Sequence, residues 1–161
     1  MSILLNGDDL IDLAVQTETR GEAFYQQAAA QAGAGPARDL FTYLAEQEAK
    51  HRETFRGLIG AVVTTEVDPT TWDETIAYIE ATVDRAFFAG GDQPIKTIDP
   101  NTTVVEMLTQ AIAFEQQTLL YFLTIRDLVK PANRPLVDQI AAEERSHVRQ
   151  LSAMRATQAL S

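Results

Sequence analysis

Both histidines of this chain lie three residues after a glutamate, as Glu48-Ala-Lys-His51 and as Glu144-Arg-Ser-His147. Three residues of an α-helix turn through about 300°, so each glutamate and its histidine would lie on one face of a helix, one turn apart. Carboxylate oxygens and imidazole nitrogens are ligand atoms for iron, manganese and zinc. Each pair is therefore a candidate half of a metal site.

A further glutamate precedes each pair at nearly the same distance. The interval from Glu18 to Glu48 is 30 residues and the interval from Glu115 to Glu144 is 29 residues. Such an interval fits a helix, a tight loop and an antiparallel second helix. The two halves are offset by 97 residues (115 − 18) and by 96 residues (144 − 48). The repeat predicts one metal site with six protein ligands: Glu18, Glu48, His51, Glu115, Glu144 and His147.

The duplication decides between a metal site and ordinary solvated pairs. A single Glu-x-x-His pair on a helix is more often a solvated pair, but here apolar residues flank every member, and burying four carboxylates without a cation would be very costly. Four carboxylates balance two divalent ions, and hard oxygen donors with one imidazole per ion favour iron or manganese. We expect two iron ions, with manganese or zinc as alternatives, and oxidation of Fe(II) by O₂ or H₂O₂.

Composition limits the classes of protein that could carry this site. A chain of 161 residues with 45% hydrophobic content predicts a single domain over residues 1–161. The formal net charge of −10 argues against binding to nucleic acid or to an anionic membrane. The chain has no cysteine, which excludes a rubredoxin-type iron centre and an iron–sulfur cluster within it. No basic leader and no membrane-spanning apolar run is visible, so we expect a cytoplasmic protein.

Helical periodicity covers most of the chain and predicts an all-α fold. Gly33-Ala-Gly-Pro36 and Lys130-Pro131 each separate two long helices, which would pair as antiparallel hairpins. A connection of about 40 residues, from Ala61 to Thr102, joins the hairpins and carries an additional helix with Thr71 as its expected N-cap. The expected helices are residues 8–31, 38–60, 72–88, 103–129 and 134–158.

The arrangement resembles a ferritin-like four-helix bundle, in which two helices each supply a Glu and two others each supply a Glu-x-x-His. Within that superfamily it is similar to the rubrerythrins, through Glu18-Thr-Arg-Gly21-Glu-Ala-Phe24-Tyr25 and Glu115-Gln-Gln-Thr118-Leu-Leu-Tyr121-Phe122. The resemblance covers residues 8–60 and 100–158. It implies that Glu48 and Glu144 bridge two metals, with Glu18 and His51 on one ion and Glu115 and His147 on the other.

Two departures from the rubrerythrin pattern accompany this resemblance. Typical rubrerythrins carry a further glutamate where this chain has Thr118, and they carry a cysteine-rich electron-transfer domain that this chain lacks. The ligand set of four Glu and two His is similar to that of bacterioferritin. The resemblance also implies a homodimer.

The leading interpretation is a non-haem di-iron oxidoreductase that reduces peroxide or O₂ while oxidising Fe(II), with an unidentified electron donor. One alternative is a ferroxidase that feeds an iron store, in its own cage or as cargo of a protein shell. A second alternative is a structural bundle stabilised by metal, without turnover.

Several side chains near the predicted ligands have more than one expected role. Tyr25 and Tyr121 are candidate catalytic residues near the metals, either as hydrogen-bond donors, which we favour, or as radical traps. Both are also expected to pack mainly in the core. Trp72 and Tyr78 are expected to cover the bundle or to form a dimer contact. Glu22 and Glu53 are expected to be surface charges. Glu46 and Glu143 are also expected to be surface charges, or to lead metal ions inward.

Overall fold

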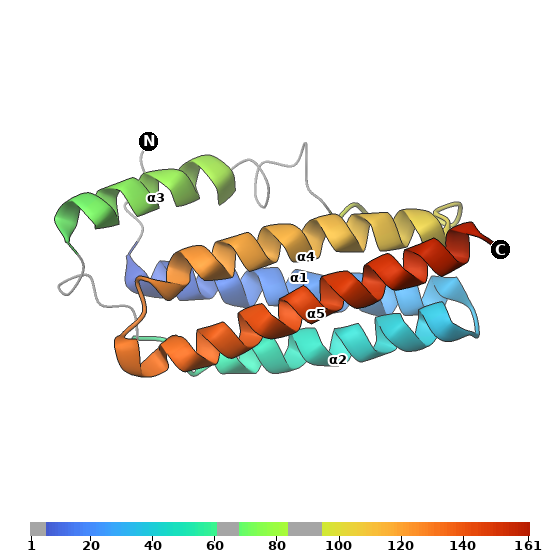
Figure 1. Ribbon diagram of the computed structural model, residues 1–161, viewed down its shortest axis with the longest axis horizontal. Coiled ribbons are helices and arrows are strands. Elements are labelled where there is room, and N and C mark those ends of the chain that lie inside the picture. Colours follow the sequence, from blue (N-terminus) through green and yellow to red (C-terminus); the bar gives the residue numbers. More distant parts are fainter. Residues whose placement is uncertain (1–5, 61–67, 84–94) are drawn as a thin grey trace.

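The structure, a computed structural model, describes residues 6–60, 68–83 and 95–161. Four long helices form two antiparallel hairpins, α1 with α2 and α4 with α5, and these pack into one bundle (Figure 1). The predicted all-α fold of two helical hairpins with an additional helix in the crossover is confirmed. The elements in chain order are α1 (Gly7–Ala32), α2 (Pro36–Arg56), α3 (Pro69–Val83), α4 (Val104–Arg126), the short 3₁₀ helix η2 (Pro131–Asn133) and α5 (Arg134–Ala159).

Local sequence signals fix the ends of the first hairpin. The Asn6 side chain accepts hydrogen bonds from the backbone N–H groups of Asp8 and Asp9, and the Asp9 carboxylate accepts one from the Asn6 N–H, which forms a capping box. Gly33 and Gly35 have φ angles of 70° and 142° in the turn between α1 and α2. These are conformations that favour glycine, so the turn needs both residues.

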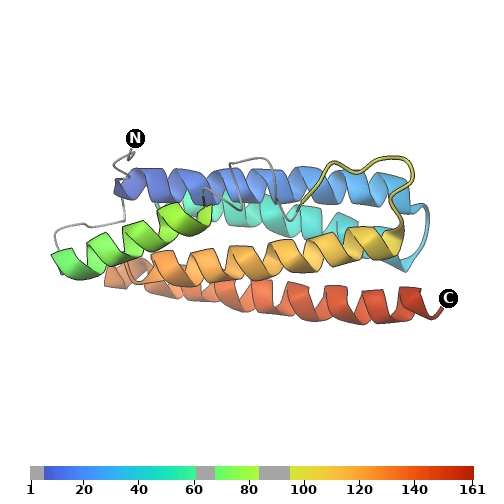
Figure 2. The same cartoon turned by 90° about the horizontal axis from the view of Figure 1, so that it is seen from above.

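The long connection changes the direction in which the second hairpin starts. The chain leaves α2 at one end of the bundle and begins α4 at the other end, so that α2 and α4 run parallel (Figure 1, Figure 2). Thr103 and Glu106 form a second capping box at the start of α4. In this arrangement α1 packs against α4 and α2 packs against α5, so the corresponding helices of the two hairpins are neighbours in the bundle.

Four expected helix boundaries need correction or remain outside the described residues. Helix α4 ends at Arg126 instead of residue 129. Thr71 is not an N-cap, because α3 begins at Pro69 and the Asp68 carboxylate accepts a hydrogen bond from the Thr71 N–H at 3.1 Å. Asp68 followed by proline at the first helical position is the stronger start signal. Helix α2 ends at Arg56 instead of residue 60, and Gly60 takes a φ of 79° in the turn that follows. The predicted end of the middle helix at residue 88 lies outside the described residues.

Helix α3 packs against the bundle near the N-terminus of α1 (Figure 1). Ile79 is buried in the same cluster as Leu10 and Leu128, and Trp72 is partly buried against it. Tyr78 is 44% exposed. Trp72 therefore takes part in covering the bundle, and the dimer contact considered for these residues remains a prediction.

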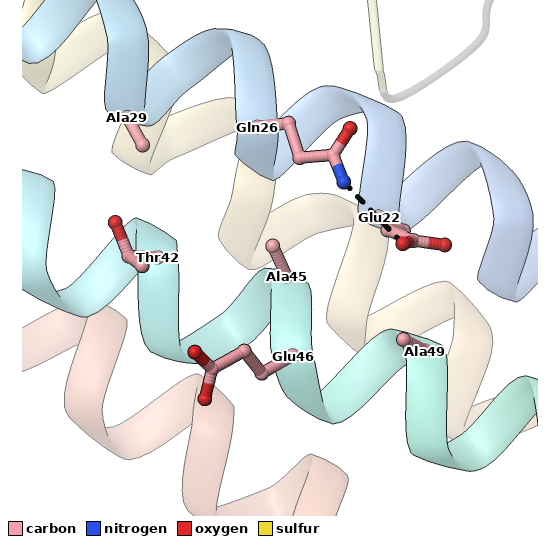
Figure 3. Close-up of a pocket in the computed structure, with 7 residues that line it drawn as sticks. All are labelled: Glu22, Gln26, Ala29, Thr42, Ala45, Glu46 and Ala49. Atoms are coloured by element: carbon pink, nitrogen blue, oxygen red, sulfur yellow. Dashed lines mark hydrogen bonds between the residues drawn. The ribbon is translucent and has the colours of Figure 1, made fainter.

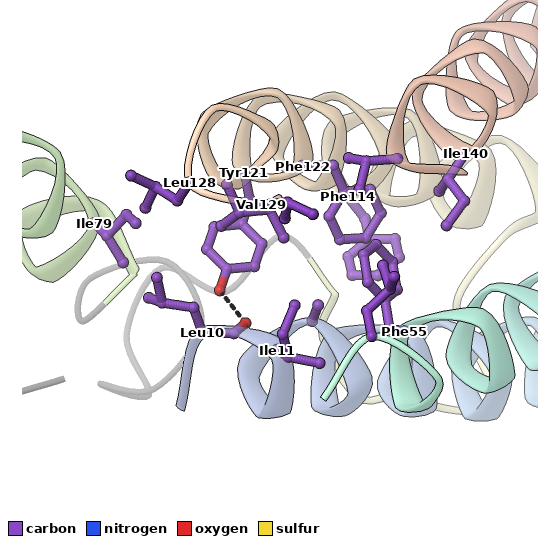
Figure 4. Packing of buried hydrophobic residues seen from close by; sticks show 14 residues of the cluster. Leu10, Ile11, Phe55, Ile79, Phe114, Tyr121, Phe122, Leu128, Val129 and Ile140 are labelled. Atoms are coloured by element: carbon purple, nitrogen blue, oxygen red, sulfur yellow. Dashed lines mark hydrogen bonds between the residues drawn. The ribbon is translucent and has the colours of Figure 1, made fainter. Parts of the chain in front are cut away.

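The bundle interior consists of two apolar clusters. One lies toward the N-terminus of α1 and includes Leu10, Phe55 and Phe122 (Figure 4). The other includes Phe24, Phe41 and Leu108. On each of the four long helices, a stretch with buried polar residues separates members of the first cluster from members of the second. No described helix is long and apolar enough to cross a membrane.

Candidate metal centre

Six of the buried polar residues between the two apolar clusters are those that the sequence repeat singled out, and we call these six the polar layer. The first helix of each hairpin, α1 or α4, supplies one glutamate. The second helix of each hairpin, α2 or α5, supplies one Glu-x-x-His pair. All six side chains are buried, with at most 2% exposure. The structure thus brings together in one layer Glu18, Glu48, His51, Glu115, Glu144 and His147.

The polar layer divides into two overlapping groups of possible ligands. One group is Glu18, Glu48, His51 and Glu144, and the other is Glu48, Glu115, Glu144 and His147. Within each group, one ligand atom from every member lies within 4.8 Å of the others. Glu48 and Glu144 belong to both groups, so the geometry suits two adjacent ions that share two carboxylates.

The two imidazoles present the same ring nitrogen to the carboxylates. His51 Nδ1 lies 2.9 Å from Glu144 Oε1 and 3.8 Å from Glu18 Oε2. His147 Nδ1 lies 3.2 Å from Glu144 Oε2 and 3.7 Å from Glu115 Oε1. The two rings stack with centroids 5.7 Å apart. Nδ1 is therefore the nitrogen available to a metal in both halves.

Unsatisfied buried oxygens test whether these residues fit a metal. Both carboxylate oxygens of Glu18, both of Glu48 and Oε2 of Glu115 are buried and accept no hydrogen bond from any described residue. A buried carboxylate without donors is strongly destabilised, whereas a cation satisfies several such oxygens at once. The donor set is hard oxygen with one imidazole for each group, which fits divalent first-row metals. The residues fit a dinuclear metal site.

Burial and mutual repulsion govern the charges of the carboxylates in the protein without metal. Burial, followed by the charges of the neighbouring glutamates, raises the pKa of Glu48 well above its ordinary value, and burial likewise raises the pKa of Glu18. Burial and the charge of Glu144 raise the pKa of Glu115 to about 8. Burial also acts to raise the pKa of Glu144, but hydrogen bonds with Glu115 and both histidines outweigh it and hold that pKa well below its ordinary value.

The pKa values of both histidines are raised, which favours the protonated imidazole. Burial acts to lower the pKa of His51, but its hydrogen bond with Glu144 and the charge of that group raise it to about 9. Burial opposes the same change at His147, where hydrogen bonds with Glu115 and Glu144 raise the pKa to about 10. At neutral pH the metal-free layer therefore holds protons, which metal ions would displace.

The two tyrosines differ in their hydrogen-bond partners. The buried Tyr25 hydroxyl donates to Glu115 Oε1, which fixes that carboxylate from the neighbouring hairpin. The Tyr121 hydroxyl donates to the Leu10 carbonyl at 2.6 Å, within the first apolar cluster (Figure 4). Tyr25 therefore acts on a polar-layer side chain, whereas this bond of Tyr121 links α4 to the backbone of α1.

Glu143 is a functional candidate that sequence reasoning assigned mainly to the surface. Its Oε2 lies 2.7 Å from His51 Nε2, and its Oε1 accepts a hydrogen bond from Gln139 at 3.0 Å. Because Nδ1 of His51 faces the polar layer, Nε2 is left to donate to this carboxylate, an arrangement that orients metal-ligating histidines. In the first half of the repeat the corresponding position (143 − 96) is Gln47, which carries no charge. The sequence signal that could have indicated this role of Glu143 is its position directly before the predicted ligand Glu144.

The other three glutamates lie outside the polar layer, as expected for surface charges. The Glu22 carboxylate pairs with Arg52, and Glu53 pairs with Arg56 at 2.6 Å. Glu22 and Glu46 also line an open groove of about 380 Å³ between α1 and α2 (Figure 3). None of the six polar-layer residues lines this groove, whose other lining residues are Gln26, Ala29, Thr42, Ala45 and Ala49.

The architecture and the buried carboxylate–histidine layer define a ferritin-like helical bundle. A crystal structure from Thermotoga maritima, described as that of a ferritin-like diiron-carboxylate protein, is similar over 97% of this chain and 98% of that chain, with a TM-score of 0.69 and 23% sequence identity. A comparison with curated proteins gives no match. The Rubrerythrin family model matches residues 9–89, just over half of the chain, and the chain belongs to that family.

Proposed function

We propose that this protein is a non-haem di-iron oxidoreductase that reduces peroxide or O₂ while oxidising Fe(II). The observation that carries the proposal is the sharing of Glu48 and Glu144 between two four-residue groups of ligand atoms. In this proposal Glu48 and Glu144 would be shared by two iron ions. Glu18 and His51 would complete the ligands of one ion, and Glu115 and His147 would complete those of the other.

The bound metals would supply the electrons, since two Fe(II) ions give up the two electrons that reduce one H₂O₂ to two H₂O with uptake of two protons. The protein's own groups prepare the site. The two apolar clusters keep bulk water from the polar layer on both sides along the bundle axis. Tyr25 holds the Glu115 carboxylate, and Glu143 holds the His51 ring, so that the ligands need little rearrangement. Repeated turnover requires an external electron donor.

Metal content before and after an oxidant pulse tests the proposal. The wild type and a Glu48→Ala/Glu144→Ala variant would be loaded with Fe(II) without oxygen, analysed for metal, and then given H₂O₂ while absorbance is followed. A Glu46→Ala/Glu53→Ala variant is the matched control, because it removes two carboxylates outside the polar layer, from residues exposed on α2. Circular dichroism would establish that each variant remains helical.

We expect two irons per chain and a ferric absorbance band in the wild type and in the control, and loss of both in the Glu48→Ala/Glu144→Ala variant. Equal iron in both double variants, or a wild type that binds two irons and responds neither to H₂O₂ nor to a separate pulse of O₂, contradicts the proposal. Accumulation of ferric product well beyond two irons per chain favours the ferroxidase alternative. Light scattering distinguishes the expected homodimer from a storage cage.

A further inference from the structure

The Thr118 hydroxyl is a polar group in the bundle interior whose hydrogen-bonding capacity is not used by the protein. Thr118 is fully buried, and its Oγ1 has no hydrogen-bond partner among the described residues. A helical threonine has an easy partner in the carbonyl four residues earlier. On the same helix, Thr109 and Thr124 each donate to that carbonyl at 2.8 Å. A buried hydroxyl without a partner is costly, so its retention points to a ligand.

The internal repeat shows where position 118 lies relative to the shared carboxylates. Thr118 follows Glu115 by three residues, one helical turn, so both lie on the same face of α4. The offset that relates Glu115 to Glu18 also relates Thr118 to Gly21 (118 − 97). A Cβ atom added at Gly21 would lie 2.8 Å from Glu48 Oε2. The residue one turn after Glu18 therefore faces the shared carboxylate of Glu48. From the repeat we infer that Thr118, one turn after Glu115, faces the other shared carboxylate, Glu144.

The two equivalent positions differ in what they offer. At Gly21 the added Cβ atom would also lie 2.8 Å from Cε1 of the Phe114 ring, so Glu48 and this ring fill the space on the α1 side. At Thr118 there is a hydroxyl, and the counterpart of Phe114 is the smaller, polar Thr17 (114 − 97). The Thr17 hydroxyl already donates to the Leu13 carbonyl at 2.8 Å. Of these two threonines, Thr118 is therefore the one whose hydroxyl has no hydrogen-bond partner among the described residues.

We propose that the Thr118 hydroxyl donates a hydrogen bond to a small oxygen or nitrogen ligand, such as O₂, H₂O₂ or azide, that binds at the polar layer on its α4 side. The inference rests on the proposed two-metal site, and it adds which side of that site accepts the ligand. Thr118 acts as a positioning residue for the ligand, while the Gly21 side is closed to it.

Three substitutions separate this role from a structural one. Thr118→Val removes the hydroxyl and keeps the branched shape, and Thr118→Ser restores a hydroxyl. Thr124→Val is the matched control on the same helix, because the hydroxyl it removes is bonded to a backbone carbonyl. Each protein would be examined by thermal unfolding without metal, by iron content after loading, and by azide titration of the ferric protein followed by absorbance.

We expect Thr118→Val to leave the metal-free melting temperature equal to or above that of the wild type, because the protein loses no hydrogen bond. Two irons per chain should remain, while azide affinity should fall about tenfold, the typical effect of losing one hydrogen bond to a charged ligand. Thr118→Ser and Thr124→Val should bind azide within about twofold of the wild type.

Two results overturn the inference while the proposed function stands: two irons per chain with equal azide affinity in the wild type and Thr118→Val, or a lowered metal-free melting temperature in Thr118→Val. A wild-type protein that binds no iron overturns both proposals. The iron content therefore distinguishes failure of the site from failure of the role given to Thr118.

Discussion

Replacing Glu143 by glutamine should weaken metal binding mainly in the half of the site that contains His51. The Glu143 carboxylate comes from α5 and accepts the Nε2 proton of His51 on α2 at 2.7 Å. Its negative charge makes the imidazole a stronger donor to a metal at Nδ1 and fixes the ring orientation. Glu143→Gln keeps an oxygen acceptor for Nε2 but removes the charge.

The size of the effect follows from the exposure and the retained acceptor. Losing an outer partner of a metal-ligating histidine costs about 10–100-fold in metal affinity, which is about 1.4–2.7 kcal/mol. The Glu143 side chain is 38% exposed, so solvent screens part of its charge. We therefore expect about tenfold for Glu143→Gln, at the lower end of that range, and a larger loss for Glu143→Ala.

A titration with Zn²⁺ against a chromophoric chelator measures this without redox turnover. Glu46→Gln is the control for net charge, since Glu46 is exposed and is not one of the six polar-layer residues. We expect one of two binding steps to weaken in Glu143→Gln and neither to change appreciably in Glu46→Gln. Equal weakening in both variants would show that only the overall charge matters, and it would refute the orienting role of Glu143.

Three further effects follow from the same contacts. Tyr25→Phe removes a hydrogen bond to the Glu115 carboxylate and should lower the free energy of unfolding of the metal-loaded protein by about 1.5–3 kcal/mol, measured with urea; no change would exclude this bond as a stabilising contact. Tyr121→Phe loses a neutral bond to a backbone carbonyl and should cost about 1 kcal/mol in the same assay while leaving two irons per chain; lost iron would assign this residue to the site. In the metal-free folded protein, the pKa of Glu115 is raised from 4.5 to about 8, and those of His51 and His147 are raised from 6.5 to about 9 and about 10. The folded chain then binds more protons than the unfolded chain from about pH 5 to 9, so its melting temperature should fall as the pH rises through this window and the metal-loaded protein should show a smaller fall; a metal-free melting temperature that rises would contradict these shifts.

The residues of the polar layer could be predicted from the sequence because helical periodicity and the internal repeat determine their spacing. Glu48 and His51 must share a helix face whatever the bundle looks like, and the near-equal spacings place Glu18 and Glu115 opposite such faces once each hairpin closes. The structure brings these residues together with the others of the layer. Their roles as metal ligands, like the single domain and the homodimer, remain predictions.

Contacts between hairpins could not be read in the same way. The bond between Glu143 and His51 depends on how α5 is rotated against α2, and the sequence contains no local signal for that angle. The partner of Tyr121 is a backbone carbonyl 111 residues away, which any donor of suitable length could reach. The predicted start of α3 was wrong for a different reason. Thr71 and Asp68 are both residue types that cap helices, and the proline after Asp68 decides between them.

The differences between the two halves of the repeat bear most directly on function. The six polar-layer residues match by type across the halves, but their neighbours differ. Two of these differences concern the site: Glu143 stands where the first half has Gln47, and Thr118 stands where it has Gly21. The first difference places a carboxylate against Nε2 of His51, whereas the corresponding position in the other half is an uncharged glutamine. The second places on α4 a hydroxyl without a partner among the described residues, where α1 has a glycine. Both changes remove the twofold equivalence of two otherwise similar metal positions. A site built in this way should bind its two ions with different affinities and accept a small ligand from one side.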